Sequence, residues 1–243
     1  MTKALLGAVL LCANAASARE RAVDLSAGLQ VESVRDDLLV PLAFSGPGVS
    51  LSAGLRLPLG PGTLLARLGF GFGVVFDRLG FFGGALRYGV DGTWLAPLGP
   101  NVDLGLTLAL DTGVNYLYRW DDAHSYWLGS QWLGPAIRVH RPLGAMRLSV
   151  LAQVAAVGFV GRPPALRFVK QEGVDRFAYY FSTPYLDERF VSVDRLQLVR
   201  LEATLETASG WALLVQLRAT VTQVSAPAFA LGASVGVSRA LSW

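Results

Sequence analysis

The last fifteen residues, 229–243, constrain the fold more than any other stretch of the chain. Apolar side chains occupy the odd positions from Phe229 to Val237, and Leu241 and Trp243 continue the same face, whereas every even position is Ala, Gly or Ser. A period of two predicts a β-strand. The stretch is longer than a common strand of about 5–6 residues. It suits a tilted strand that crosses a bilayer, which needs about 9–11. We interpret it as the closing strand of a transmembrane β-barrel.

Composition is consistent with a membrane barrel. The chain is 52% hydrophobic and only 16% charged, against about 25% charged residues in soluble domains. No charge-free apolar run reaches the roughly 18 residues that a spanning helix requires. The net charge of +3 is too small to favour nucleic acid as a partner.

The N-terminus predicts a secretory signal peptide over residues 1–18, with the barrel domain spanning 19–243. Lys3 precedes an apolar segment, and Ala16-Ser17-Ala18 provides small residues for cleavage. Removal of this segment would remove Cys12, the only cysteine of the chain, so the mature chain would have no disulfide. With two histidines and no mature cysteine, no metal site and no cofactor are expected.

Nine further segments share the alternation of apolar and small or polar residues, which makes about ten strands, with eight or twelve as alternatives. The predicted strands cover 23–32, 49–57, 64–72, 86–94, 102–111, 133–140, 146–156, 199–206 and 211–222. Pro135 weakens the prediction for its strand.

The connections between these strands alternate in length. Short turns are expected at 60–62, 98–101, 141–144 and 208–210, and the longest opposing connections at 33–48, 114–130 and 160–194. Such asymmetry is typical of membrane barrels and places both termini on the periplasmic side. The fold class is therefore all-β, an antiparallel transmembrane barrel.

All six tryptophans are expected at the membrane–water interfaces, where an aromatic ring with a polar N–H is favoured. They are Trp94, Trp120, Trp127, Trp132, Trp211 and Trp243. A soluble lipocalin-like barrel is the alternative, but its apolar face would line an internal pocket. Here the other face is mostly Gly, Ser, Thr, Ala and charged residues, which suits a polar lumen.

The signal peptide, the alternating strands and the terminal aromatic resemble those of bacterial outer-membrane β-barrel proteins over essentially the whole mature chain. The resemblance implies a monomer in the outer membrane of a Gram-negative bacterium, in contact with lipid and lipopolysaccharide. It also implies that the barrel assembly machinery reads the final strand, with Trp243 at the last position. Arg239 departs from the pattern, because it shares the lipid-facing side, where charge costs little only near the interface.

The inward-facing positions carry seven cations and seven anions. They are Arg56, Arg67, Arg87, Arg138, Arg147, Arg200, Arg218, Asp24, Glu32, Asp91, Asp103, Asp111, Glu202 and Glu206. Unpaired charges in a narrow lumen are costly, and Arg pairs well with carboxylates. We expect a salt-bridged network in a mostly filled lumen, since side chains already fill the slightly narrower barrels of eight strands. Alternatively, the charges only keep the lumen wet.

Two connections offer further candidate sites. Residues 114–130 include Asp121, Asp122, His124 and Ser125, which resemble in kind the residues of barrel proteases of the omptin type and of barrel lipid A deacylases and phospholipases. Residues 160–194 mix basic and aromatic side chains suited to lipopolysaccharide or a partner protein. A solvated loop would look the same in either case. We therefore expect a non-enzymatic structural or narrow porin-like barrel, with surface binding as an alternative and a barrel hydrolase as a more distant one.

Overall fold

The computed structural model describes residues 21–37, 40–80, 82–119, 122–162, 167–168, 188–224 and 226–242, with backbone alone at 36, 40–42, 116–119, 122–127 and 167–168. The predicted signal peptide lies outside these ranges. Among the described residues, no helix is long and apolar enough to cross a membrane.

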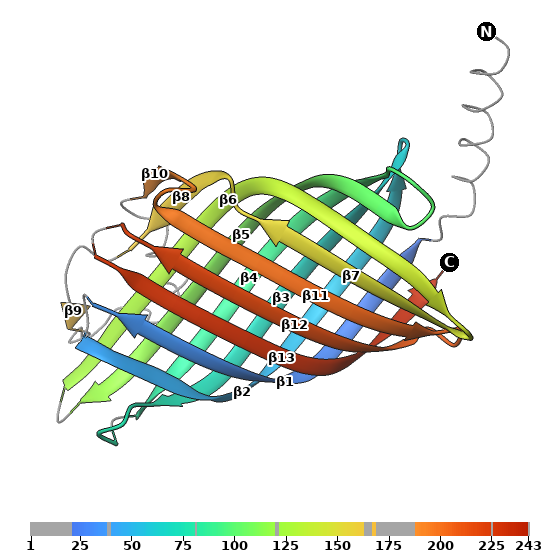
Figure 1. Ribbon diagram of the computed structural model, residues 1–243. Coiled ribbons are helices and arrows are strands. Elements are labelled where there is room, and N and C mark those ends of the chain that lie inside the picture. Colours follow the sequence, from blue (N-terminus) through green and yellow to red (C-terminus); the bar gives the residue numbers. More distant parts are fainter. Residues whose placement is uncertain are drawn as a thin grey trace, which may run out of the picture.

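The described chain is a series of antiparallel strands (Figure 1). They are β1 (Ala22–Asp36), β2 (Val40–Leu59), β3 (Gly62–Phe76), β4 (Phe82–Pro97), β5 (Val102–Arg119), β6 (Asp122–Leu143), β7 (Met146–Val154), β8 (Val157–Gly161), β9 (Arg167–Phe168), β10 (Arg189–Ser192), β11 (Leu196–Thr207), β12 (Trp211–Thr222) and β13 (Ala228–Ser242).

Ten of these strands close into a barrel in the order β1-β2-β3-β4-β5-β6-β7-β11-β12-β13. The ring is completed by β1 and β13, which pair from Ala22 opposite Ser242 to Asp36 opposite Ala228. The predicted ten-stranded antiparallel barrel and its closing strand are confirmed. A closed ring leaves none of these strands with an open edge.

The barrel has two different ends (Figure 1). Short turns join β2 to β3, β4 to β5, β6 to β7 and β11 to β12, and they share one end with Ala22 and Ser242. We call it the turn end and the opposite one the loop end. Near the loop end, residues 155–156 interrupt the wall between β7 and β8. Ala155 N there donates to Leu198 O at 2.9 Å, and β8 pairs with both β6 and β10.

Two expected connections are largely strand instead. Most of 33–48 belongs to β1 and β2, with Ser33 opposite Ser45, and most of 114–130 belongs to the hairpin of β5 and β6. Both predictions were wrong because backbone pairing continues where the hydrophobic alternation fades. A wall that rises beyond the bilayer faces water on its outer side and has no need of an apolar face. Pro135 likewise lies within β6, opposite Leu106.

The outer face of the wall is an apolar band. Leu29 is 67% exposed and Leu108 65%, and similar side chains point outward from each of the ten strands. Exposed apolar surface of this extent is unfavourable in water and suits lipid. The polar and charged side chains correspondingly point into the barrel.

The seam between β1 and β13 brings two backbones unusually close. Gly28 lies opposite Gly236, and a Cβ on Gly28 would lie 2.6 Å from Val235 O, while one on Gly236 would lie 2.5 Å from Ala27 O. Only glycine fits such an approach. These two residues therefore allow the two backbones to lie this close where the wall closes.

Candidate functional site in the barrel lumen

The lumen contains ion pairs between side chains of different strands, some adjacent in the wall and some on opposite sides of the barrel. Twelve of the fourteen predicted inward charges take part in such pairs. The pairs are Arg56–Asp24, Arg67–Glu202, Arg87–Glu32, Arg138–Asp103, Arg200–Asp91, Arg200–Asp111 and Arg218–Asp111. Arg147 and Glu206 lie outside these pairs, opposite each other in the β7–β11 register near the turn end.

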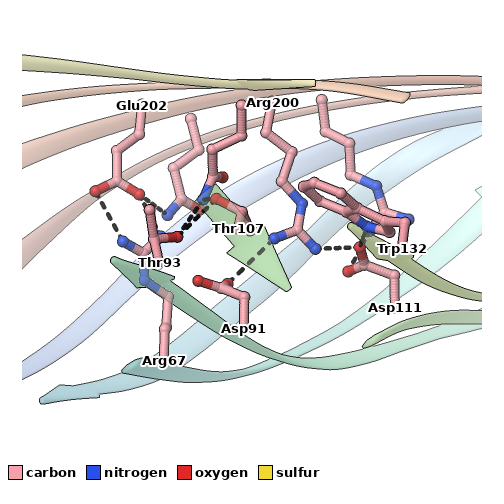
Figure 2. Close-up of polar contacts among 11 residues, drawn as sticks. Arg67, Asp91, Thr93, Thr107, Asp111, Trp132, Arg200 and Glu202 are labelled. Atoms are coloured by element: carbon pink, nitrogen blue, oxygen red, sulfur yellow. Dashed lines mark hydrogen bonds and ion pairs between the residues drawn. The ribbon is translucent and has the colours of Figure 1, made fainter. Parts of the chain in front are cut away.

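The pair of Arg67 and Glu202 spans the full width of the barrel (Figure 2). Arg67 is on β3 and Glu202 on β11, which stand five places apart in the ring of ten and are therefore diametrically opposite. The guanidinium donates from Nη1 to Oε2 and from Nη2 to Oε1, the latter at 2.9 Å. Bidentate pairing of this kind is both strong and geometrically specific. Gln216 Nε2 also donates to Glu202 Oε2, at 2.9 Å.

Asp111 is the centre of a second group of contacts across the lumen (Figure 2). Its side chain is 4% exposed and pairs with both Arg200 and Arg218, while Trp132 Nε1 donates to Asp111 Oδ2 at 3.0 Å. Arg200 Nη1 also donates to Asp91 Oδ1 at 3.1 Å. We call the Arg67–Glu202, Arg200–Asp91, Arg200–Asp111 and Arg218–Asp111 contacts the cross-lumen pairs. They join β3, β4 and β5 on one side to β11 and β12 on the other.

Trp132 lies inside the barrel and not at a membrane interface, so its predicted role was wrong. Its side chain is 1% exposed, and the guanidinium carbon of Arg200 lies 5.2 Å from the ring centroid. The ring stacks on a cation and its N–H meets a carboxylate, which satisfies both parts of the indole inside a polar lumen. The parity that it shares with Arg138 indicated this inward position.

Three side chains that were not predicted as site residues form a neutral polar layer between the cross-lumen pairs and the turn end. Gln153 Nε2 donates to Thr93 Oγ1 at 2.8 Å and to Thr107 Oγ1 at 3.0 Å. All three are buried. In the sequence they occupy the inward-facing positions of their strands, and this was the signal that could have identified them. Next to this layer, Leu65 packs against buried Leu95, Ala136 and Leu151, so that side of the lumen is filled.

Apolar side chains close much of the lumen toward the loop end. The buried cluster draws on β1, β5, β6, β8, β10, β11 and β13. Its members are Val34, Ala109, Leu128, Trp132, Ala155, Val160, Val191, Leu196, Leu198, Val224 and Ala230. Beside it, the buried Arg162 donates through Nη1 to the carbonyls of Val224, at 2.6 Å, and Ala226. A solute that passes this end must displace side chains.

One sector of the lumen stays open beside the cross-lumen pairs. A cavity of about 190 Å³ is bordered by small residues of β13, β1, β2 and β3, which we call the small-residue wall. These residues are Ser26, Gly28, Ser50, Ser52, Gly69, Gly71, Gly232, Ser234 and Gly236. The Ser26 and Ser52 hydroxyls are 2.6 Å apart and hydrogen-bonded. Charged side chains of the cross-lumen pairs form the facing side of the cavity.

Near the turn end, Asp103 accepts from Arg138, whose Nε lies 2.8 Å from Oδ2, and it lies beside His140. Arg138 Nη2 lies 2.7 Å from Asp103 Oδ2, and His140 Nδ1 lies 3.6 Å from the same oxygen. His140 Nε2 is 3.1 Å from Pro100 O, which fixes the ring against the β4–β5 turn. These contacts are consistent with a structural role for this histidine.

Of the other tryptophans predicted at the membrane interfaces, Trp94 and Trp211 lie near the turn end. Trp94 is half-buried near the turn end, where its Nε1 donates to Leu59 O at 3.2 Å. Trp211 is exposed at the same end and lies 5.3 Å from the Arg239 guanidinium carbon, which gives that outward cation an aromatic partner. The positions of Trp120 and Trp243 and the Trp127 side chain lie outside the described residues.

The candidate hydrolytic residues cannot be placed as a site. Asp121 lies outside the described residues, and Asp122, His124 and Ser125 are described by their backbone in β6. Most of 160–194 also falls outside the described ranges. Among the described side chains, no group of three or more His, Cys, Asp or Glu residues is arranged to hold a metal ion.

The closed even-numbered barrel, its apolar outer band and its polar lumen define the class of outer-membrane β-barrels. No protein-family model and no curated protein sequence matches the chain. Among solved structures, the outer membrane protease OmpT from Escherichia coli is similar with a TM-score of 0.48 at 8% identity, over 91% of this chain and 97% of that one.

Two further structures are similar to this chain. An outer membrane channel from Pseudomonas putida F1 has a TM-score of 0.45 at 10% identity, over 92% of this chain and 96% of that one. The translocator domain of the autotransporter NalP from Neisseria meningitidis has a TM-score of 0.43 at 12% identity, over 98% and 95%. At these values none of their activities transfers to this chain.

Proposed function

We propose that the chain is a monomeric outer-membrane barrel that provides a narrow passage for small solutes through a largely filled, charge-balanced lumen. The Arg67–Glu202 pair carries this proposal, because it crosses the lumen at its full width. An open general pore would keep its centre free of such a contact. The cavity beside the pair supports a passage in place of a solid core.

The outer surface supports the membrane location. The barrel strands other than β7 have 12–22 residues, and the outward apolar side chains form a band around them. A tilted strand needs only about 9–11 residues to cross a bilayer. We further propose export through the signal peptide at 1–18, contact with lipopolysaccharide, assembly through the final strand and no enzymatic activity.

The apolar cluster at the loop end predicts how this passage behaves. Because the cluster must rearrange before a solute passes, conductance should be small and intermittent. While the cluster is open, conductance should depend on the middle of the lumen, which removal of the Arg67–Glu202 pair should widen without leaving either charge unpaired.

The test is single-channel conductance of the refolded barrel in planar bilayers. Wild type should give small steps, and the Arg67→Ala/Glu202→Ala double variant should give steps several-fold larger. The Arg147→Ala/Glu206→Ala double variant is the matched control, since these two residues lie outside the cross-lumen pairs. Wild-type steps as large as those of the first double variant would show that the lumen is not filled. Folded barrels that never conduct in either form would contradict the passage itself.

Surface binding is a second candidate, favoured by the length of the β5–β6 hairpin. These strands have 18 and 22 residues and pair as far as Arg119 opposite Asp122, well beyond the length that a bilayer requires. Replacement of residues 116–125 by Asn-Gly would join the register partners Asn115 and Tyr126 with a two-residue turn. If the hairpin binds at the cell surface, cells that display the shortened barrel should lose attachment while conductance stays unchanged. Equal attachment by both barrels would exclude this role for the hairpin.

A further inference from the structure

Two glycines of the small-residue wall differ from Gly28 and Gly236 of the same wall. A Cβ on Gly69 or on Gly232 would meet nothing within 4 Å, whereas one on Gly28 would collide with the backbone of β13. The backbone therefore does not require glycine at positions 69 and 232. The structural effect of these two glycines is free space inside the lumen cavity, which both residues border.

The size of the cavity limits its contents. At about 190 Å³ it holds roughly six waters, taking about 30 Å³ for each. It is therefore large enough for one small organic solute with a few waters. Hydroxyls of Ser26, Ser50 and Ser52 border the same space and can replace part of that shell.

The electrostatics of the cavity limit the charge of its contents. Four guanidinium groups and four carboxylates border it, so the cavity has no net charge from these groups. Side chains of the Arg67–Glu202 pair remain 28% and 17% exposed, so both signs are accessible from the open space. An ion of one sign would lose hydration and find equal attraction and repulsion.

A solute with both charges meets a different environment. Its carboxylate can accept from a guanidinium while its ammonium donates to a carboxylate a few ångströms away. Each of its charges then replaces one half of an existing pair, so no group is left unpaired during passage. A neutral solute of the same size gains only hydrogen bonds between uncharged and charged groups, which are weaker than charge-assisted bonds between two ions.

We propose that the lumen cavity is the solute route and that it favours small zwitterions, such as amino acids of minimal size. Gly69 and Gly232 determine the size limit of this route, and Arg67 with Glu202 provides the two charges. This inference rests on the proposed function as a narrow passage, and it adds the chemical class of the solute.

The test is swelling of liposomes that contain the refolded barrel, in glycine and in its uncharged isomer glycolamide. Wild type should swell at least twofold faster in glycine. The Gly69→Leu/Gly232→Leu double variant fills the cavity, removes no charged group and should swell at the protein-free rate. Gly92→Leu is the matched control, because Gly92 also has no atom within 4 Å of a Cβ but faces outward from β4. The smaller Gly69→Ser/Gly232→Ser variant should be intermediate and serves if the leucine variant does not fold.

The outcomes separate this proposal from the one on which it rests. Equal swelling in both solutes, or faster swelling in glycolamide, would overturn the preference for zwitterions while the passage stands. Swelling of folded leucine and serine variants at the wild-type rate would overturn the cavity as the route. Folded wild-type barrels that swell in neither solute would overturn the narrow passage itself.

Discussion

The side chains on the two sides of the lumen extend into the barrel interior to very different extents. Arginines and a glutamate of β3, β11 and β12 extend across the barrel and, with Asp91 of β4 and Asp111 of β5, form the cross-lumen pairs. The small-residue wall of β13, β1, β2 and β3 stops at glycine or at a serine hydroxyl. One side thus fixes opposite strands to one another, and the other leaves the space that a solute could use. The residues that hold opposite strands together and the small residues that leave the cavity open can therefore be changed separately.

The largest effect should come from Asp111→Ala, which removes the carboxylate shared by Arg200 and Arg218. Two buried cations lose a partner, and loss of one partner from a buried ion pair costs about 3–5 kcal/mol. The free energy of unfolding, measured by denaturant titration in lipid vesicles, should fall by this amount. Glu206→Ala on the inner face of β11 is the control and should change it by less than about 1 kcal/mol. Equal losses in both variants would mean that the cross-lumen pairs do not stabilise the barrel.

On the opposite side, Gly28→Val tests the close approach at the seam. The added Cβ would lie 2.6 Å from Val235 O, and overpacking of this kind costs about 1–3 kcal/mol. The denaturant midpoint should fall accordingly. Gly69→Ala, on the same wall but with open space around its Cβ, should leave the midpoint almost unchanged. If both variants lose the same stability, the distinction between crowded and uncrowded glycines of this wall is wrong.

Away from the small-residue wall, Gln153→Leu tests whether neutral hydrogen bonds from β7 to β4 and β5 also stabilise the barrel. It removes the donor to both Thr93 and Thr107 and should cost about 1–2 kcal/mol. Ser149→Ala on the same face of β7 provides the comparison and should cost less. Single-channel recording of Gln153→Leu should show wild-type steps, because leucine keeps the volume of that layer filled. Larger steps would instead place the narrowest point at Gln153.

The smallest effect is expected for Ser26→Ala on the small-residue wall. The hydroxyl pairs with Ser52 on the adjacent strand at 2.6 Å, and a bond that water can replace contributes about 0.5–1 kcal/mol. Thermal unfolding followed by circular dichroism would resolve a shift of a few degrees at most. Ser50→Ala on the same wall is the reference. A loss comparable to that of Asp111→Ala would show that both sides stabilise the barrel equally.

Sequence alone predicted the strands that cross the membrane better than those above it. The alternation in 102–111 predicts β5 because one face meets lipid and the other meets the lumen. Residues 114–119 continue the same strand without that contrast, so their pairing with β6 could not be predicted from the sequence. Parity also placed Trp132 inward with Arg138, but a general preference of tryptophan for interfaces overrode this signal.

Sequence alone could not predict which inward-facing charges pair with each other. Parity places Arg67 and Glu202 inside, but their contact depends on strands that are 135 residues apart in sequence. Which strands face each other follows from the strand number and the stagger of the closed ring. Neither quantity is encoded in a single strand. The cavity depends on the same closure of the ring, so it could not be predicted from the sequence either.

The pairing of the first strand with the last has a consequence for how this chain reaches its final state. Asp24 lies opposite Ala240, so the ring cannot close before nearly the whole chain has been delivered. Contacts of such long sequence separation form slowly. Until closure, Arg67 lacks its partner Glu202 on the opposite side of the ring, and charged groups without their partners are costly in hydrocarbon. The incomplete barrel must therefore keep its inner face wet, and water should leave the lumen only in the last step of assembly.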